Sequence, residues 1–303
     1  MELSEEVFDV DQVIAGNIPT GDDQCRFDAN VLENVIKRLI EEKLGNANAS
    51  MVDTDSSDSK PCPTFVVATS AANAEGPPVL FRSYGCEGFN ANKCAIWQAA
   101  RCTSAAPSFF RSMFVDVPAP GGWYVDGGLR HNNPAQLVLD EAALIWPSVK
   151  RFCLVSIGTG RQKNVEFVDI EYSPAPKADS SKNPIRSVLS RLPGSKLLGK
   201  VKNTPSGLGE VIKIGKACVA MSTSSDPVDD SVFKIANSRD PGHRFPYYRF
   251  NVEKGMESIG LAEWKAKVRM GELTAQYMRT GQGQLKRNTC VQDLWKPEAV
   301  ERK

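Results

Sequence analysis

The group in this sequence that is best suited to chemistry is one carboxylate followed by two glycines, Asp126-Gly127-Gly128. It follows the apolar run Trp123-Tyr124-Val125, which predicts a strand that ends on the aspartate. Ligands of open α/β sheets bind outside the carboxyl ends of strands, so a carboxylate there can act as a general acid or base. Glycines let the backbone turn sharply and approach another segment. The same pattern also occurs where an aspartate only caps a turn, and this alternative stays open.

The chain has only two histidines, which limits any mechanism that depends on an imidazole base. His131 lies five positions after Asp126 and could suggest a different acid–base pair. We interpret this proximity as incidental, because a general base must also reach a nucleophile within about 3 Å. His243 stands between Gly242 and Arg244 and is predicted to be a surface residue.

Hydroxyl-bearing and glycine-rich segments give weaker candidates. Ser104 and Ser108 are near the aspartate motif in sequence, but the segment 103–107 is predicted to pack beside the site rather than to react. Gly158-Thr159-Gly160 follows an apolar strand, yet the chain has no G-x-G-x-x-G or phosphate-loop pattern. A nucleotide-binding α/β protein is therefore the weakest of the alternatives.

The composition is that of an ordinary globular protein. Hydrophobic residues make up 41% and charged residues 24%, and the net charge of +1 gives no indication of nucleic-acid binding. The 8 cysteines form no C-x-x-C pair and no zinc-ligand spacing, so we expect reduced thiols and neither metal nor cofactor. No apolar run reaches the length of about 18 residues that a membrane span needs. The acidic start of the chain is unlike a signal peptide, and we expect a cytoplasmic protein.

The hydrophobic pattern predicts strands that alternate with helices. A helix is expected over 28–44, with Asp28 as N-cap and Gly45 as its stop, and further helices over 94–101, 134–145, 208–221 and 261–278. Strands are expected over 64–68, 79–84, 123–125 and 152–157. This alternation predicts a layered α/β fold with a mostly parallel sheet flanked by helices.

A basic stretch separates the two parts of the chain. Between residues 177 and 202 lie seven Lys or Arg residues against Asp179 alone. The stretch is either a solvated linker or a partly amphipathic patch that rests on anionic lipid as a peripheral membrane contact. We accordingly divide the chain into a core at 1–160, a basic linker at 161–206, C-terminal helices at 207–290 and a charged tail at 291–303.

Several motifs occur together in a fixed order. They are Trp97–Pro107 followed by Phe109-Phe110, Tyr124–Leu129, Asn132-Asn133-Pro134 and Leu154–Gly160, with Arg26-Phe27-Asp28 before them and Tyr248–Val252 and Ile259-Gly260-Leu261 after them. This ordered set resembles the second half of the patatin-like phospholipase (lipid acyl hydrolase) domain, in the form common in fungi. The resemblance covers residues 1–290.

The resemblance implies a Ser–Asp dyad hydrolase without cofactor or metal that acts on phospholipid or acylglycerol at a membrane surface. In the family, a serine on a G-x-S-x-G turn attacks the ester, and the aspartate of a D-G-G or D-G-A motif acts as the base. Asp126 matches that aspartate, and Gly127 and Gly128 match the glycine positions of the motif. A glycine-rich loop supplies N–H groups to the oxyanion.

The sequence departs from the family at the nucleophile. It contains neither G-x-S-x-G nor a G-G-G-x-R-G loop, and Leu3–Phe8 resembles the stretch that follows the nucleophile helix. We therefore expect an N-terminally truncated domain that holds only the aspartate half of the dyad and is inactive by itself. Two hypotheses follow: a hydrolase whose serine is encoded in a longer product, or an inactive patatin-like fragment that binds lipid or protein. The truncation is expected to uncover an apolar sheet edge, and the oligomeric state stays open.

Overall fold

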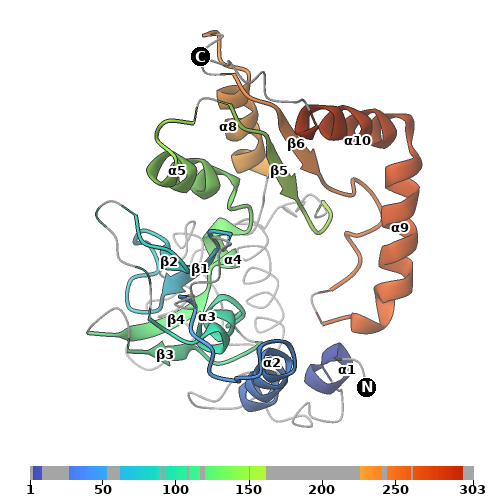
Figure 1. Ribbon diagram of the computed structural model, residues 1–303. Coiled ribbons are helices and arrows are strands. Elements are labelled where there is room, and N and C mark those ends of the chain that lie inside the picture. The colour runs from blue at the N-terminus through green and yellow to red at the C-terminus, as the bar shows by residue number, and fades with distance from the viewer. Residues whose placement is uncertain are drawn as a thin grey trace, which may run out of the picture.

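The protein has a mixed α/β fold in which two separate sheets carry the helices (Figure 1). The computed structural model describes residues 3–8, 27–52, 62–86, 88, 91, 93–107, 109–116, 120–149, 151–161, 226–240, 244–260 and 262–295. The helix predicted over 208–221 and the basic patch at 177–202 lie outside these residues.

The larger sheet has four strands in the order β2-β1-β4-β3. Their bounds are β1 Phe65–Ser70, β2 Val79–Arg82, β3 Met113–Val115 and β4 Gly122–Asp126. Every pair in this sheet is antiparallel, so the prediction of a mostly parallel sheet is wrong here. For the pairs β1–β2 and β3–β4 the reason is the length of the connections, because the loops 71–78 and 116–121 are too short for the crossover that parallel neighbours need.

One helix, α3, packs directly on this sheet, and α2 packs on α3. α2 (Ala29–Leu44) begins at Asp28, whose side chain accepts a hydrogen bond of 2.7 Å from the Asn30 N–H, and ends at Gly45 in the left-handed conformation. α3 (Ile96–Thr103) packs on β1, β3 and β4, and α1 (Leu3–Val7) lies against α2. The core between α3 and the sheet consists of Ala68, Phe81, Cys94, Ala99, Cys102, Val115 and Tyr124. The predicted helices at 28–44 and 94–101 are confirmed in type and position.

The smaller sheet pairs β5 (Leu154–Ile157) with β6 (Tyr247–Phe250) in parallel. This direction is possible because a long crossover that includes α8 (Asp226–Ala236) connects the two strands. α5 (Ala135–Ile145) packs on α8, and their shared core contains Ala135, Leu154 and Val232. Figure 1 shows α5 and α10 on opposite sides of this sheet.

The C-terminal region consists of two consecutive helices. A 3-10 turn at Trp264–Ala266 leads into α9 (Lys267–Arg279), and α10 (Gly281–Leu294) follows. α10 is fixed to β6 by two contacts: the Tyr248 hydroxyl bonds to Asp293, and the Lys286 Nζ donates to the Arg249 carbonyl oxygen at 2.9 Å. In the described part of the chain, no helix has the length and apolar character needed to span a bilayer.

Candidate functional site

Asp126 is the last residue of β4, and its backbone is held on two sides. It pairs with Ala68 of β1, and its N–H donates a hydrogen bond of 3.0 Å to the carbonyl oxygen of Ala105. The side chain turns back onto the following corner, where Oδ1 accepts a bond of 2.7 Å from the Gly128 N–H. The short helix α4 (Gly128–His131) begins there. The strand thus ends on the aspartate as predicted. The bond from the Gly128 N–H is the turn cap that the sequence analysis left open as the alternative role of this carboxylate.

Gly127 lets this corner approach β1 closely. A Cβ added at Gly127 would lie 2.7 Å from the carbonyl carbon of Val67 and closer still to its oxygen. The same Val67 oxygen accepts a hydrogen bond of 2.6 Å from the Thr103 hydroxyl at the end of α3. β1, the end of α3 and the corner at Gly127 therefore meet at the Val67 carbonyl, and only a glycine at position 127 leaves room for that corner.

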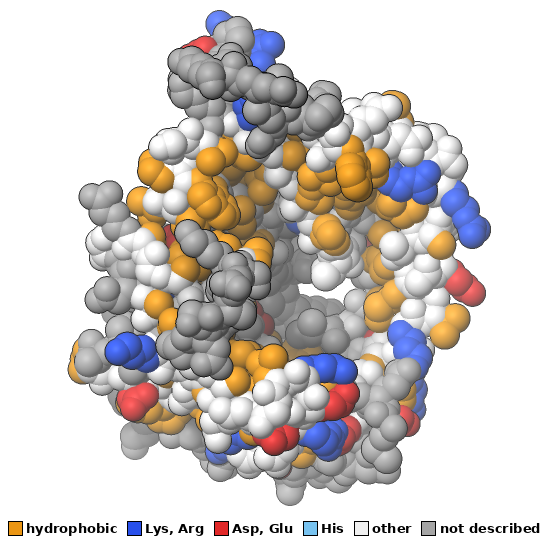
Figure 2. Space-filling model, viewed as in Figure 1, with side chains coloured by type: hydrophobic (Ala, Val, Ile, Leu, Met, Phe, Trp, Pro, Cys, Tyr) orange, Lys and Arg blue, Asp and Glu red, His pale blue; other side chains and the backbone are white. Residues whose placement is uncertain are grey.

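The Asp126 side chain lies on the wall of a cavity of about 580 Å³. The described lining contains no serine; it comprises Pro63, Thr64, Phe65, Val66, Val67, Tyr84, Thr103, Asp126, Gly128, His131, Asn132, Pro134, Val138, Glu141, Ala142, Ile145 and Trp146. The apolar members come mainly from the start of β1 and from one face of α5. Figure 2 shows apolar side chains gathered beside the hollow of this face of the molecule.

Burial sets the protonation of the ionisable groups at the cavity. Desolvation raises the pKa of Asp126, and the hydrogen bond from the Gly128 N–H offsets part of this rise. Desolvation lowers the pKa of His131, and the positive charge of Arg130 lowers it further. Both shifts favour the neutral forms. His131 and Asp126 line the same cavity. The sequence analysis had interpreted the proximity of these two residues in the chain as incidental.

A second carboxylate of the wall, Glu141, is engaged in an ion pair. It receives bonds from Arg82 Nε and Nη2 at 2.6 and 2.7 Å and from the Tyr84 hydroxyl at 2.7 Å. The hydrogen bond from Arg82 is the main reason why the pKa of Glu141 lies below its usual value. Desolvation and the bond to Glu141 raise the pKa of Tyr84. The sequence analysis missed this cluster. The feature that could have indicated it is the acidic Glu141 at the start of the otherwise apolar run 141–145 of α5.

The glycines after β5 serve packing between β5 and β6. A Cβ added at Gly158 would lie 2.7 Å from the Arg249 Nη2, and the Gly160 N–H donates to the Asn251 Oδ1 at 2.7 Å. Gly160 also has a φ of 109°, which a residue with a side chain adopts only with strain. The side chains of Arg249 and Asn251 therefore fill the space beside Gly158, and Asn251 accepts the Gly160 N–H.

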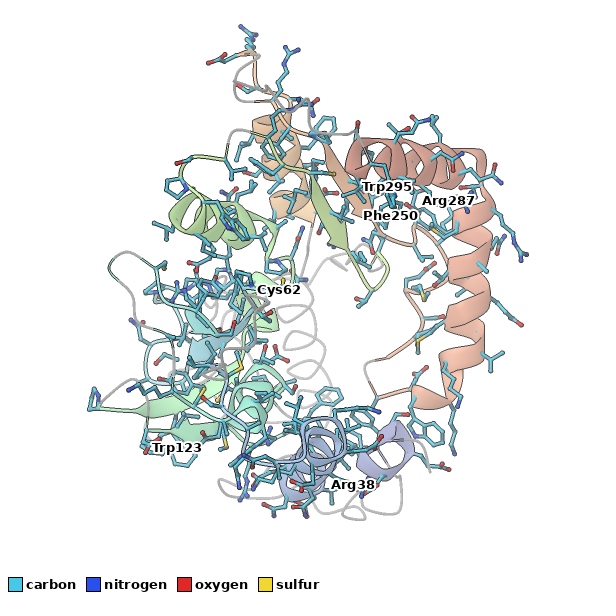
Figure 3. All side chains as sticks on the ribbon, in the orientation of Figure 1. Arg38, Cys62, Trp123, Phe250, Arg287 and Trp295 are labelled. Atoms are coloured by element: carbon cyan, nitrogen blue, oxygen red, sulfur yellow. The ribbon has the colours of Figure 1, made fainter. Side chains whose placement is uncertain are left out.

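None of the other candidate residues is among the described lining residues of the cavity. Ser104 ends α3 and is absent from the cavity lining, while Ser108 and His243 lie outside the described residues. Cys62, which is labelled in Figure 3, is an exposed cysteine, and the next residue, Pro63, lines the cavity. Within the described segments, no three His, Cys, Asp or Glu side chains come together in a way that could hold a metal ion.

Comparison with known proteins identifies related sequences. Residues 12–139 match the sequence model of the patatin-like phospholipase family. Calcium-independent phospholipase A2-gamma of Mus musculus is 31% identical over 171 residues, and that of Homo sapiens is 30% identical over 171 residues. Each alignment covers 54% of this chain and 20% of the relative. Phospholipase A I of Arabidopsis thaliana is 43% identical over 68 residues, which is 22% of this chain and 5% of that protein.

The chain thus spans about a fifth of the length of the phospholipase A2-gamma proteins that it matches. The family match ends thirteen residues after Asp126, so the strand, the aspartate and both glycines lie inside it. The mixed α/β arrangement of sheets and covering helices is compatible with this assignment. Residues 12–139 are thus similar to the patatin-like phospholipase family, and Asp126-Gly127-Gly128 lies within this matched segment.

Proposed function

We propose that Asp126 is the general base of a lipid acyl hydrolase site that cleaves carboxylic esters of phospholipids or acylglycerols. The observation that carries the proposal is the position of this carboxylate at a strand end on the wall of a largely apolar cavity. The match to patatin-like phospholipase sequence and the similarity to phospholipases A support the same reaction class.

In the proposed mechanism, Asp126 removes the proton from the hydroxyl of a nucleophilic serine, which the described lining of the cavity does not itself supply. The Gly128 N–H holds Oδ1, and no described residue donates a hydrogen bond to Oδ2, which is therefore the oxygen assigned to the proton. The serine Oγ forms a bond to the acyl carbon as the proton moves to Oδ2, and Asp126 then protonates the departing alkoxide. A water molecule repeats both steps and releases the fatty acid.

The raised pKa of Asp126 suits this role. A base transfers protons best when its pKa approaches the working pH, and an ordinary aspartate with a pKa of about 3.9 is a weak base. Burial in the apolar cavity makes the Asp126 carboxylate more basic, while the bond from the Gly128 N–H keeps it oriented. No histidine is needed in this scheme, although His131 lies on the same wall.

The test compares the full gene product with its Asp126→Asn and Asp116→Asn variants on phosphatidylcholine vesicles, with released fatty acid as readout. Asp116 is an exposed aspartate just after β3 and serves as the matched control. Loss of the base is expected to lower turnover by about 10²–10⁴-fold, while the control keeps wild-type turnover. The proposal fails if Asp126→Asn retains wild-type turnover, or if the folded wild-type product releases no fatty acid.

A further inference from the structure

Two cysteines that are far apart in the chain meet where α10 packs on the smaller sheet. Cys153 directly precedes β5, and Cys290 lies on α10. Their thiols are hydrogen-bonded to each other, although the residues are 137 positions apart in the chain. Both are free cysteines, so the contact is made in the reduced state. Figure 1 shows α10 beside β6, the strand that pairs with β5.

The meeting of the two thiols is part of a wider contact between helix and sheet. Lys286, Cys290 and Asp293 follow one another at spacings of four and three, which puts them on one face of α10. The Lys286 Nζ donates to the Arg249 carbonyl oxygen at 2.9 Å, and Asp293 accepts from the Tyr248 hydroxyl. This face of α10 is therefore held on β6 by two further bonds, and the thiol contact does not depend on freely moving side chains.

The two thiols differ in their access to solvent. Cys153 is partly exposed, whereas only 5% of the Cys290 surface is exposed. A small oxidant therefore reaches Cys153 first, with Cys290 placed behind it as the second thiol. Desolvation raises the pKa of both thiols, so the pair is protonated and stays reduced at neutral pH until an oxidant is present.

We propose that Cys153 and Cys290 form an oxidative modification site, at which a peroxide converts the pair into a disulfide that joins α10 covalently to the start of β5. In the first step the Cys153 thiolate attacks one peroxide oxygen, the O–O bond breaks, and a sulfenic acid and a water molecule form. The Cys290 sulfur then attacks the sulfenic sulfur. An S–S bond replaces the S–O bond, and the hydroxide leaves as water with the Cys290 proton. Each sulfur gives up one electron, and the peroxide is reduced to two water molecules.

The disulfide would act on the stability of the C-terminal part of the chain. A bond between residues 153 and 290 closes a loop of more than a hundred residues and so restricts the unfolded chain. It also holds α10 on a sheet of only two strands, which has little stability without a covering element. The oxidised protein should therefore unfold at a temperature about 5–10 °C above that of the reduced protein.

The experiment treats the folded wild-type chain with hydrogen peroxide, blocks the remaining thiols with iodoacetamide and maps the tryptic peptides by mass spectrometry without reduction. The expected product joins peptides 152–161 and 288–302, each of which contains one cysteine, and dithiothreitol separates them. Cys94 and Cys102 form the matched control because they belong to one core cluster and are fully buried. This second pair should stay unlinked, since peroxide does not reach it.

Two variants separate the disulfide from other oxidation. In Cys153→Ser, peroxide should produce neither the linked peptides nor the rise in the thermal midpoint. Cys62→Ser removes an exposed cysteine outside the pair and should respond to peroxide like the wild type.

The wild-type peptide map decides the question even where a variant does not fold. Oxidation of Cys62 in a folded chain that lacks the 152–161 to 288–302 link would overturn the site. A statistical mixture of cysteine pairs, a link between Cys94 and Cys102 of equal yield, or an unchanged thermal midpoint of the linked chain would do the same. No step involves Asp126 or an ester, so the outcome is independent of the proposed function.

Discussion

Replacing Gly127 by alanine tests the close approach that positions Asp126. The Gly127 backbone has φ −64° and ψ −22°, a conformation that alanine adopts without strain. Any destabilisation must therefore come from the added methyl group. That methyl would lie 2.7 Å from the Val67 carbonyl carbon and 2.9 Å from its Cγ1.

The magnitude follows from these distances. Carbon atoms in proteins pack at about 3.5–4.0 Å, so β1 or the corner after β4 must move by close to 1 Å. Overpacking of this kind costs about 1–3 kcal/mol, and here the obstacle is backbone rather than a flexible side chain end. Alanine gains about 0.4–1 kcal/mol by restricting the unfolded chain. The net expectation for Gly127→Ala is a loss of about 1–2 kcal/mol in the free energy of unfolding, together with weakening of the Thr103 bond to Val67.

The assay is urea unfolding of wild type, Gly127→Ala and Gly271→Ala. Gly271 lies inside α9, and a Cβ there would meet nothing within 4 Å. Its replacement should stabilise the chain by about 0.5–1 kcal/mol through helix propensity alone. The two substitutions are chemically identical, so opposite signs isolate the contact with Val67. A Gly127→Ala chain as stable as Gly271→Ala would refute the packing argument.

Three further outcomes follow from the described contacts. Glu141→Gln should cost about 3 kcal/mol in urea unfolding by leaving Arg82 without its buried anion, whereas Glu42→Gln, at an exposed pair, should change nothing measurable. Because the pKa of Glu141 is lowered in the folded state, its carboxylate stabilises the fold fully above the unfolded pKa of about 4.3, and this stabilisation disappears as the pH falls through the folded pKa. On acidification, the Glu141→Gln variant should therefore lose less stability than the wild type. The raised pKa of Asp126 has the opposite sign: its ionised form opposes folding at neutral pH, so Asp126→Asn should raise the thermal midpoint at pH about 7 and leave it unchanged at pH about 3. Asp28→Ala should lower the free energy of unfolding by about 1 kcal/mol through loss of the α2 N-cap. A variant that melts at the same temperature as the wild type would contradict the capping role of Asp28.

The elements of the fold were predictable where their signals are local. Asp28 and Gly45 bound α2 because a cap and a left-handed stop depend only on neighbouring residues. Strand direction depends instead on which strands pair, and the alternation of strands with helices in the sequence predicts parallel strands. The lengths of the loops at 71–78 and 116–121 held the correct information, since such short connections join antiparallel strands.

The candidate site, too, was predictable from the sequence only where its contacts are local. Asp126 could be found from sequence because a strand end, a carboxylate and a glycine corner are contiguous, and its bond to Gly128 spans two residues. The cavity could not be found from the sequence, because its wall includes an ion pair between Arg82 and Glu141, which are 59 positions apart in the chain. Helical periodicity shows that α5 has an apolar face but not that this face meets a cavity rather than a core. Since the ion pair joins α5 to β2 while the corner is fixed by β1, loss of Glu141 should loosen α5 from β2 and leave the Asp126 carboxylate on its Gly128 donor.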